Sequence, residues 1–213
     1  MDIYQALHSR HTIRDFEQDN GIPRALEATL VRKLIEAGFA AATNDHMRDW
    51  HFVLLNDLEQ RKQLVSEVIK PVSRKRSETI INRWGLTDPD QREMYLEGIP
   101  RQFSMLNNCG CLILPFYRQD RPLLKPKDLS ALNYFASIWL CIANIFNAAS
   151  AEGVYGVVRI PATEENKVVK ARLNIPANYE FPCWIALGYP APDAHRARQV
   201  SIELDTRIHQ NQW

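Results

Sequence analysis

The sequence predicts an α+β domain in which helices cover both faces of a central sheet, a three-layer α/β/α arrangement. Residues 23–42 carry apolar side chains at helical spacing, and residues 128–152 form a helix candidate that is apolar nearly all round. Three short apolar runs, 50–55, 111–117 and 181–187, have the length and composition of buried strands. Because helical segments outnumber strand candidates, we expect one compact unit with a small sheet and a large helical content.

The first part of the chain is expected to form a short N-terminal helix, a longer helix, a strand and a further helix. Proline suits a first helical turn, so the longer helix is predicted to begin near Pro23 and to run to about Ala42. The apolar run 50–55 is followed by Asp57 and Gln60, which resemble a helix-starting cap. A strand followed directly by a helix is therefore predicted here.

The segment from Pro71 to Asn108 is rich in arginine and poor in apolar residues. We expect helical pieces with breaks near Gly85, Pro89 and Pro100. Such a segment is typical of an insertion or lid, and a partner-binding or dimer-wrapping role is the open alternative. Its aromatic residues either cap a substrate site or pack within the segment: Trp84, Tyr95 and Phe103.

The second half predicts two buried strands and two helices. Cys111–Tyr117 is the best strand candidate, and Pro115, which lacks an N–H, is expected near a strand end or edge. Asp128–Glu152 is apolar nearly all round and predicts the central core helix, because its asparagines argue against a membrane span. A helix over Glu164–Leu173, a strand over Phe181–Leu187 and a polar tail complete the chain.

Composition excludes several classes of protein. Lys+Arg number 26 and Asp+Glu 25, a net charge of +1, so no overall field favours nucleic acid or an anionic membrane as a partner. The first twenty residues lack the basic and apolar regions of a signal peptide, which predicts a cytoplasmic protein. The four cysteines have apolar neighbours and are expected to be buried thiols. No metal-ligand spacing is present, and no metal site is predicted.

Two basic groups near the ends of the chain are candidates for binding an oxyanion. The run Arg10–Arg14 combines two guanidinium groups, an imidazole and a hydroxyl within five positions. Arginine offers a planar fork of donors, and such a set suits a phosphate. The run His195–Arg198 adds two more arginines after the last predicted strand. Charge alone leaves an ordinary solvated surface as the alternative for both groups.

Taken in this order, the segments resemble the nitroreductase-like family of FMN-dependent NAD(P)H oxidoreductases. The resemblance is carried by the opening run Arg10–Arg14, the loop Ala42–Trp50, the apolar helix that ends at Gly153, and the closing Leu187–Pro190. The loop departs from the family pattern, because Arg48-Asp49 replaces Gln-Pro. The resemblance implies a single nitroreductase-like domain over 1–213, with a mixed, mostly antiparallel sheet and an insertion at about 71–108.

The resemblance also implies FMN as the cofactor and a homodimer with FMN at the subunit interface. NAD(P)H would reduce the flavin, and a nitro compound, quinone or enone would then take the electrons by ping-pong turnover. Arg14 is the implied catalytic residue, because a positive charge beside the flavin pyrimidine stabilises its reduced, anionic form. A turn at Val157–Pro161 would offer backbone N–H groups to the hydride-accepting nitrogen of the flavin. The implied cofactor-binding residues are Arg10, His11, Thr12, Arg14, Thr43, Asn44, Arg48, Val158, Arg159, Ile160, Arg196 and Arg198.

Two alternatives remain open at this point. The first is an enzyme of the same fold with different chemistry, a flavin-dependent dehalogenase or dehydrogenase, which the unusual Arg48, Asp49 and Arg159 would mark. The second is a non-catalytic flavin-binding or sensing protein that uses the same phosphate cluster. Bleaching of a bound flavin by NAD(P)H would separate the enzymes from the binder.

Overall fold

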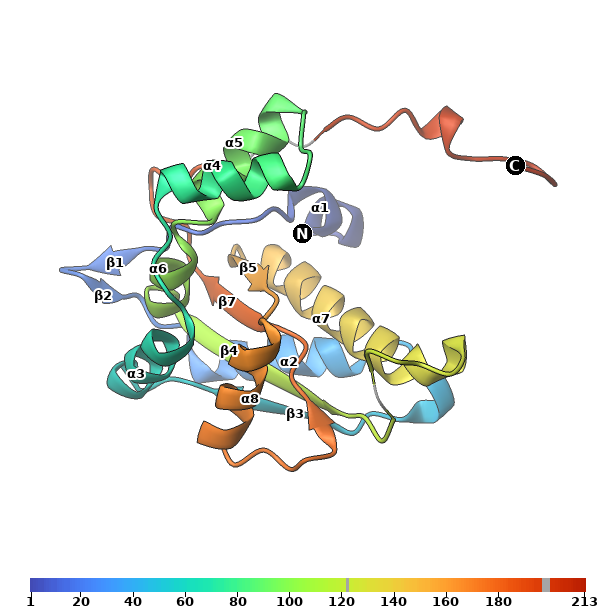
Figure 1. Cartoon of the computed structure of the whole chain (residues 1–213), viewed down its shortest axis with the longest axis horizontal. Helices are drawn as coiled ribbons and strands as arrows, with labels where there is room; N and C mark the ends of the chain where they lie inside the picture. Colours follow the sequence, from blue (N-terminus) through green and yellow to red (C-terminus); the bar gives the residue numbers. More distant parts are fainter. Residues whose placement is uncertain (122, 197–199) are drawn as a thin grey trace. The chain divides into compact units, whose positions relative to one another are not determined.

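The computed structural model describes residues 1–121, 123–196 and 200–213. The chain divides into two compact units (Figure 1). The larger unit contains residues 1–71 and 101–196, and the smaller contains residues 72–100 and 197–213. The sheet, the Arg10–Arg14 run, His195 and Arg196 belong to the larger unit.

A five-stranded sheet forms the centre of the larger unit, in the order β3-β4-β7-β5, with β6 also paired to β4. Every pair of neighbouring strands is antiparallel, which confirms the predicted α+β class. The strands are β3 (Trp50–Leu54), β4 (Cys111–Arg118), β5 (Tyr155–Arg159), β6 (Tyr179–Glu180) and β7 (Trp184–Gly188).

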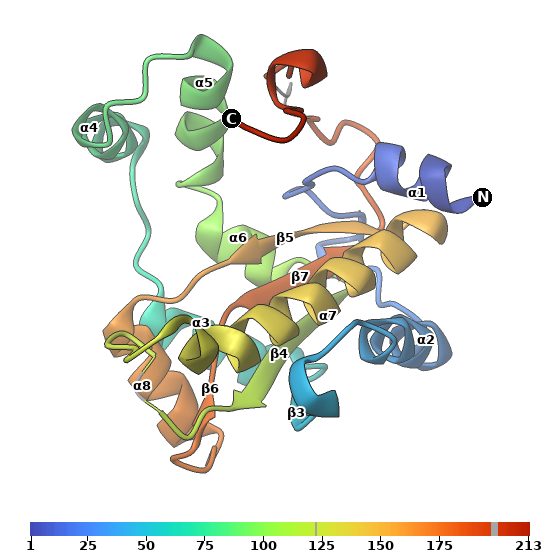
Figure 2. The same cartoon turned by 90° about the vertical axis from the view of Figure 1, so that its right-hand side faces the viewer.

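Helices cover both faces of this sheet, so the predicted three layers are present (Figure 2). Successive side chains of β4 point to opposite faces: Ile113 packs into the core formed with α2 and α7, and Leu112 and Leu114 pack into the core formed with α3, α6 and α8. Burial on both faces explains the continuous apolar run. The helices are α1 (Ile3–Ser9), α2 (Ala28–Phe39), α3 (Leu58–Val68), α6 (Gln102–Asn107), α7 (Asn133–Ala151) and α8 (Thr163–Arg172).

Pro115 lies inside β4 opposite Phe52 of β3, not near a strand end as predicted. On the other side of β4, pairing with β7 stops at Ile113 and pairing with β6 begins at Tyr117. The ladder is therefore interrupted beside Pro115, which is where a residue without an N–H is tolerated within a sheet.

The predicted start of the first long helix is wrong. Pro23 belongs to a hairpin of β1 (Gln18–Asp19) and β2 (Ile22–Pro23), and α2 begins only at Ala28. Asn20 and Gly21 both have positive φ angles, of 50° and 80°, as the tightest hairpin turns require. The Asn-Gly pair was the sequence signal for this hairpin.

Two predicted helix starts have aspartate caps, and the cap at Asp57 is the predicted one. The Asp57 carboxylate accepts a hydrogen bond from the Gln60 N–H at 2.8 Å at the start of α3. Asp128 accepts one from Ala131 at 3.0 Å and begins η2 (Leu129–Leu132), which leads into α7. Within the described chain, Leu129–Ala151 is the one segment with the length and apolarity of a membrane span, a property that core helices share. One side of α7 is buried in the core, whereas its apolar composition predicts burial nearly all round: Ala136, Leu140 and Ala143 are exposed.

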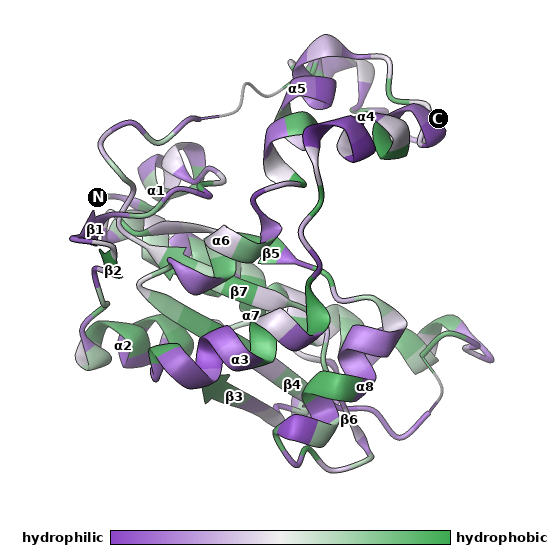
Figure 3. Cartoon of the chain, turned by 60° about the vertical axis from the view of Figure 1, so that its left-hand side comes forward, coloured by the Kyte–Doolittle hydropathy of each residue, from purple (hydrophilic) through white to green (hydrophobic). Residues whose placement is uncertain are grey.

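The smaller unit contains α4 (Arg74–Arg83), α5 (Pro89–Gly98) and η3 (Leu204–Thr206). The predicted breaks at Gly85 and Pro89 are present: Gly85 has a φ of 67°, and Pro89 is the first residue of α5. Figure 3 shows α4 and α5 as largely hydrophilic, and their small core is formed by Ile81, Leu96 and Ile99. The last piece of the predicted 71–108 insertion, α6, belongs to the larger unit.

Candidate functional site

The N-terminal basic run is positioned by backbone contacts with the sheet. Thr12 forms a parallel bridge with Gly156 of β5, and the Ile13 N–H donates to the Gly156 carbonyl at 3.2 Å. Phe16 then forms an antiparallel bridge with Pro190, just after β7. The chain from Thr12 to Phe16 is therefore anchored between β5 and the segment that follows β7.

Arg14 lines a cavity of about 300 Å³ to which three distant parts of the chain contribute. Arg101 lies at the N-terminal end of α6 and forms an ion pair with Asp15, and His195 follows β7. Two guanidinium groups and an imidazole thus converge on one cavity, a donor set that suits a phosphate. The polar lining residues are Arg14, Asp15, Gln18, Arg101, Ser104, Asn108, Asp193 and His195.

The structure brings one member of each predicted basic group to this cavity, Arg14 from the first and His195 from the second. Arg10 is exposed at the C-terminal cap of α1, and Arg196 is exposed next to His195. Arg198 lies outside the described residues.

His11 and Thr12 both contact β5, His11 through its ring and Thr12 through its backbone. The His11 ring packs on Tyr155 with centroids 4.3 Å apart. Its Nδ1 lies 2.6 Å from the Ser9 carbonyl oxygen, which only accepts, so Nδ1 carries the proton. Thr12 is half-buried and contributes its backbone to the bridge with β5.

The turn predicted at Val157–Pro161 is wrong. β5 continues through Val158 to Arg159, which is level with Trp184 of β7, and the chain leaves the sheet only at Ile160. The β-branched Val157-Val158 pair suits a strand, and this was the local signal for one.

The Arg159 guanidinium is engaged within the protein. It donates to both Glu165 carboxylate oxygens at 2.5 and 2.8 Å, and its Nε donates to Gln102 Oε1 at 2.9 Å. Only 11% of the side chain is exposed. Arg159 therefore joins the end of β5 to the starts of α6 and α8, and the contribution of this strand to a ligand would come from its backbone.

The third predicted segment, the loop of Thr43, Asn44 and Arg48, lies elsewhere. Asn44 contacts the N-terminal half of α7, where its N–H donates to Ser137 Oγ at 3.2 Å. The Ser9 and Ser150 hydroxyls form a hydrogen bond of 2.8 Å near the opposite end of α7. Ser137 and Ser150 are 13 residues apart, about 20 Å along a helix. One chain therefore places this loop far from the Arg10–Arg14 run (Figure 1).

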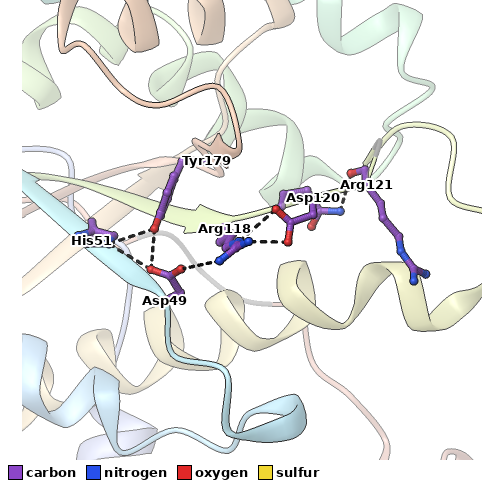
Figure 4. Close-up of polar contacts among 7 residues, drawn as sticks. Asp49, His51, Arg118, Asp120, Arg121 and Tyr179 are labelled. Atoms are coloured by element: carbon purple, nitrogen blue, oxygen red, sulfur yellow. Dashed lines mark hydrogen bonds and ion pairs between the residues drawn. The ribbon is translucent and has the colours of Figure 1, made fainter.

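Asp49, which departs from the family pattern, belongs to a polar cluster that links the ends of three strands (Figure 4). Its Oδ1 accepts a hydrogen bond from the Tyr179 hydroxyl at 2.6 Å and lies 3.2 Å from His51 Nε2. Arg118 Nη1 lies 3.8 Å from Asp49 Oδ2, and Arg118 Nε donates a hydrogen bond to Asp120. The Tyr179 hydrogen bond, then the His51 and Arg118 contacts, hold the pKa of Asp49 below its ordinary value, and the same hydrogen bond raises the pKa of Tyr179.

We expect Asp49→Asn to lower the melting temperature by a few degrees at most at neutral pH, because the cluster is partly exposed. Because the pKa of the Asp49 carboxyl is lowered by folding, its stabilisation is complete above the pKa of the unfolded state and disappears as the pH falls through the lowered folded pKa. The difference between wild type and variant should therefore be constant above about pH 5 and vanish in acid. Thermal unfolding from pH 3 to 7 measures it, with the exposed Asp205→Asn as control. A difference that grows in acid would contradict the prediction.

Sequence reasoning missed Arg101, Ser104 and Asn108 as cavity residues. Arg101 appeared only as one of several arginines in a polar insertion. It lies 86 positions from Asp15, its ion-pair partner, so no local spacing reveals the contact. Only the packing of α6 against the N-terminal run brings them together.

The model of the nitroreductase family matches residues 7–189. The chain belongs to the nitroreductase family. This confirms the resemblance that the basic run, the apolar helix and the closing strand indicated. An iodotyrosine deiodinase of Nematostella vectensis is 23% identical over 200 residues, 91% of this chain and 69% of that protein.

Two solved structures of similar fold carry ligands. The crystal structure of oxidized iodotyrosine deiodinase bound to FMN and 3-iodo-L-tyrosine matches the whole of both chains, with a TM-score of 0.71 and 15% identity. The NADPH:FMN oxidoreductase from Vibrio harveyi complexed with NAD⁺ matches 99% of this nitroreductase-family chain and 77% of its own, with a TM-score of 0.68 and 16% identity. At these identities the likeness shows the shared fold.

Proposed function

We propose that this protein is an FMN-dependent oxidoreductase that uses NAD(P)H to reduce a small conjugated acceptor, a nitro compound, quinone or enone. The observation that carries the proposal is the cavity where Arg14, Arg101 and His195 converge beside the sheet in a member of the nitroreductase family. Similar structures that bind FMN and NAD⁺ support the choice of cofactor and reductant. We place this activity in the cytoplasm, where NAD(P)H is available.

The cavity has the chemistry of a phosphate site. Arg14, Arg101, Ser104 and His195 supply nitrogen and hydroxyl donors, and Asp15 is already paired with Arg101. We infer that these side chains hold the FMN phosphate, with Arg10, Thr12 and Arg196 as further ligands; the contact of Arg198 stays a prediction, because that residue lies outside the described part of the chain. The bound flavin would accept a hydride from NAD(P)H and pass two electrons to the acceptor. The positive charge of Arg14 would favour the reduced, anionic flavin.

The remaining predicted contacts require a second subunit. Thr43, Asn44 and Arg48 lie at the end of α7 away from the Arg10–Arg14 run, so we infer that they meet the flavin of the other protomer. Backbone groups of Val158 and Ile160, with Arg159 as their support, would line the same site.

The exposed face of α7 supports a homodimer. Ala136, Leu140 and Ala143 recur at spacings of four and three, which places them on one face, and all three are exposed, Leu140 to 50%. Small residues beside one large apolar residue allow two helices to approach closely. A twofold-symmetric pair would bury this face and bring the loop of each protomer to the other.

We expect Leu140→Arg to convert the dimer to a monomer of 24.6 kDa, because a charge at the centre of an apolar interface loses its hydration. Sedimentation velocity at micromolar concentration measures the mass. Val168→Arg on α8, at another partly exposed apolar position, is the matched control and should stay dimeric. A Leu140→Arg protein that sediments as the wild type would remove the α7 interface.

The direct test of the function is spectroscopic. The purified protein should be yellow or gain flavin absorbance when titrated with FMN, and NADH or NADPH should bleach it anaerobically. A quinone or nitro compound should then restore the colour. A protein that never binds FMN overturns the proposal, and bound FMN that neither nicotinamide reduces points to the non-catalytic binder.

Reductive dehalogenation is the second candidate, favoured by the similarity to iodotyrosine deiodinases in both sequence and structure. Chemically reduced enzyme mixed with 3-iodotyrosine would release iodide if this candidate holds. The same mixture would leave the flavin reduced if only nitro compounds or quinones are acceptors. The role of residues 71–108 as a lid remains a prediction that substrate-dependent proteolysis would examine.

A further inference from the structure

Arg61, on the first turn of α3, is a charged side chain with only 2% of its surface exposed. Its Nε donates to the Leu55 carbonyl at 2.9 Å, and its Nη1 donates to the carbonyls of Asn107 at 3.2 Å and Cys109 at 2.8 Å. In the part of the chain that the structure describes, no carboxylate forms an ion pair with Arg61, and its hydrogen bonds come from Nε and Nη1. Carbonyl dipoles only partly compensate a buried charge, so this site favours an anion.

Arg61 lines a cavity of about 400 Å³ whose other walls are mostly apolar. Three large apolar side chains that line the cavity are also solvent-exposed, Ile22 to 62%, Leu54 to 37% and Leu58 to 40%. Leu26 and Val31 are buried in its interior. The cavity therefore joins an exposed apolar surface to a buried guanidinium.

Two helix N-termini add to the positive potential of this cavity. α2 borders it through Ala28, its first residue, and its N-cap residue Glu27 makes no side-chain cap hydrogen bond. α3 borders it through Leu58, and there the Asp57 carboxylate caps the helix. Neither of these exposed carboxylates pairs with Arg61. The N–H groups of the first turn of α2 thus remain as donors beside the cavity.

We propose that this cavity is a second ligand site, which binds a small amphipathic carboxylate such as a medium-chain fatty acid. The carboxylate would meet Arg61 and the first turn of α2, and the hydrocarbon chain would cover the apolar walls. The site is separate from the Arg14 cavity. The turn at 107–110 lies between them, because Asn108 lines the Arg14 cavity whereas Cys109 and Gly110 line this one.

The test is calorimetric titration of the full-length protein, saturated with FMN, with octanoate and with 1-octanol. The two probes share a chain length and differ in charge. Octanoate should bind saturably and at least about tenfold more tightly than octanol, because a charge-assisted hydrogen bond is lost in the alcohol. Further FMN should not displace it. Equal binding of the two probes, no saturable binding at millimolar concentration, or displacement by FMN would overturn the proposal.

Two variants locate the site. Ala28→Trp should fill the cavity and abolish octanoate binding, whereas Thr29→Trp, one position along α2 and outside the lining, should bind as wild type. Arg61→Met should remove the preference for octanoate over octanol. If Arg61→Met does not fold, the comparison of Ala28→Trp with Thr29→Trp still tests the location of the site. Octanoate binding that survives Ala28→Trp would place the ligand elsewhere.

Discussion

Gly156→Ala is expected to lower the free energy of unfolding by about 3 kcal/mol or more. A Cβ at Gly156 would collide with the Ala186 carbonyl oxygen on β7 and would lie 2.8 Å from Leu187 Cδ2. Neither neighbour moves easily, because both belong to the fully buried central strand. Urea unfolding measures the effect.

The matched control is Gly153→Ala, just before β5. Gly153 has a φ of 71°, and a Cβ added there would meet nothing within 4 Å, so only the left-handed backbone conformation is penalised, by about 1–2 kcal/mol. Equal loss in the two variants would show that the β5–β7 contact is not the cause. Gly156→Ala should also weaken FMN binding, because Thr12 and Ile13 are bonded to Gly156 and carry Arg14 with them.

The second large effect is expected for Arg14→Gln, which keeps some hydrogen bonding and removes the charge. FMN affinity should fall by about ten- to a hundredfold, the range for a charge-assisted hydrogen bond of about 1.5–3 kcal/mol. The flavin midpoint potential should also fall, with each 30 mV worth about 1.4 kcal/mol for a two-electron couple. Hydride transfer from NAD(P)H should slow accordingly.

Fluorescence titration, a redox titration and stopped-flow reduction measure these three quantities. Arg32→Gln on α2 is the control, because that arginine is exposed and pairs with Glu36, four residues further along the same helix. Arg32→Gln should keep the wild-type FMN affinity, flavin midpoint potential and hydride-transfer rate. If Arg14→Gln keeps all three as well, Arg14 neither holds the flavin nor tunes its potential.

Local sequence determined much of the fold. Three predicted features depend on neighbours along the chain: the continuous apolar run of β4, the Asp57 cap of α3 and the long apolar stretch that forms α7. The resemblance to the nitroreductase family was also carried by short motifs, whose residues are close together in the sequence. The hairpin at Asn20-Gly21 and the strand at Val157-Val158 also have local signals, but Pro23 is equally typical of a helix start and the family resemblance implies a turn at Val157–Pro161.

Tertiary structure decided the candidate sites. Arg14, Arg101 and His195 meet only because α6 and the segment after β7 pack beside the N-terminal run, and no spacing along the chain encodes such contacts. The family resemblance places Arg159 at the cofactor, whereas the fold bonds its guanidinium to Glu165 and Gln102. Arg61 gave no sequence signal, because a buried guanidinium is recognised only by the carbonyls and the cavity around it. Helices and strands follow from interactions a few residues apart, whereas charge and burial at a site depend on residues that only folding brings together.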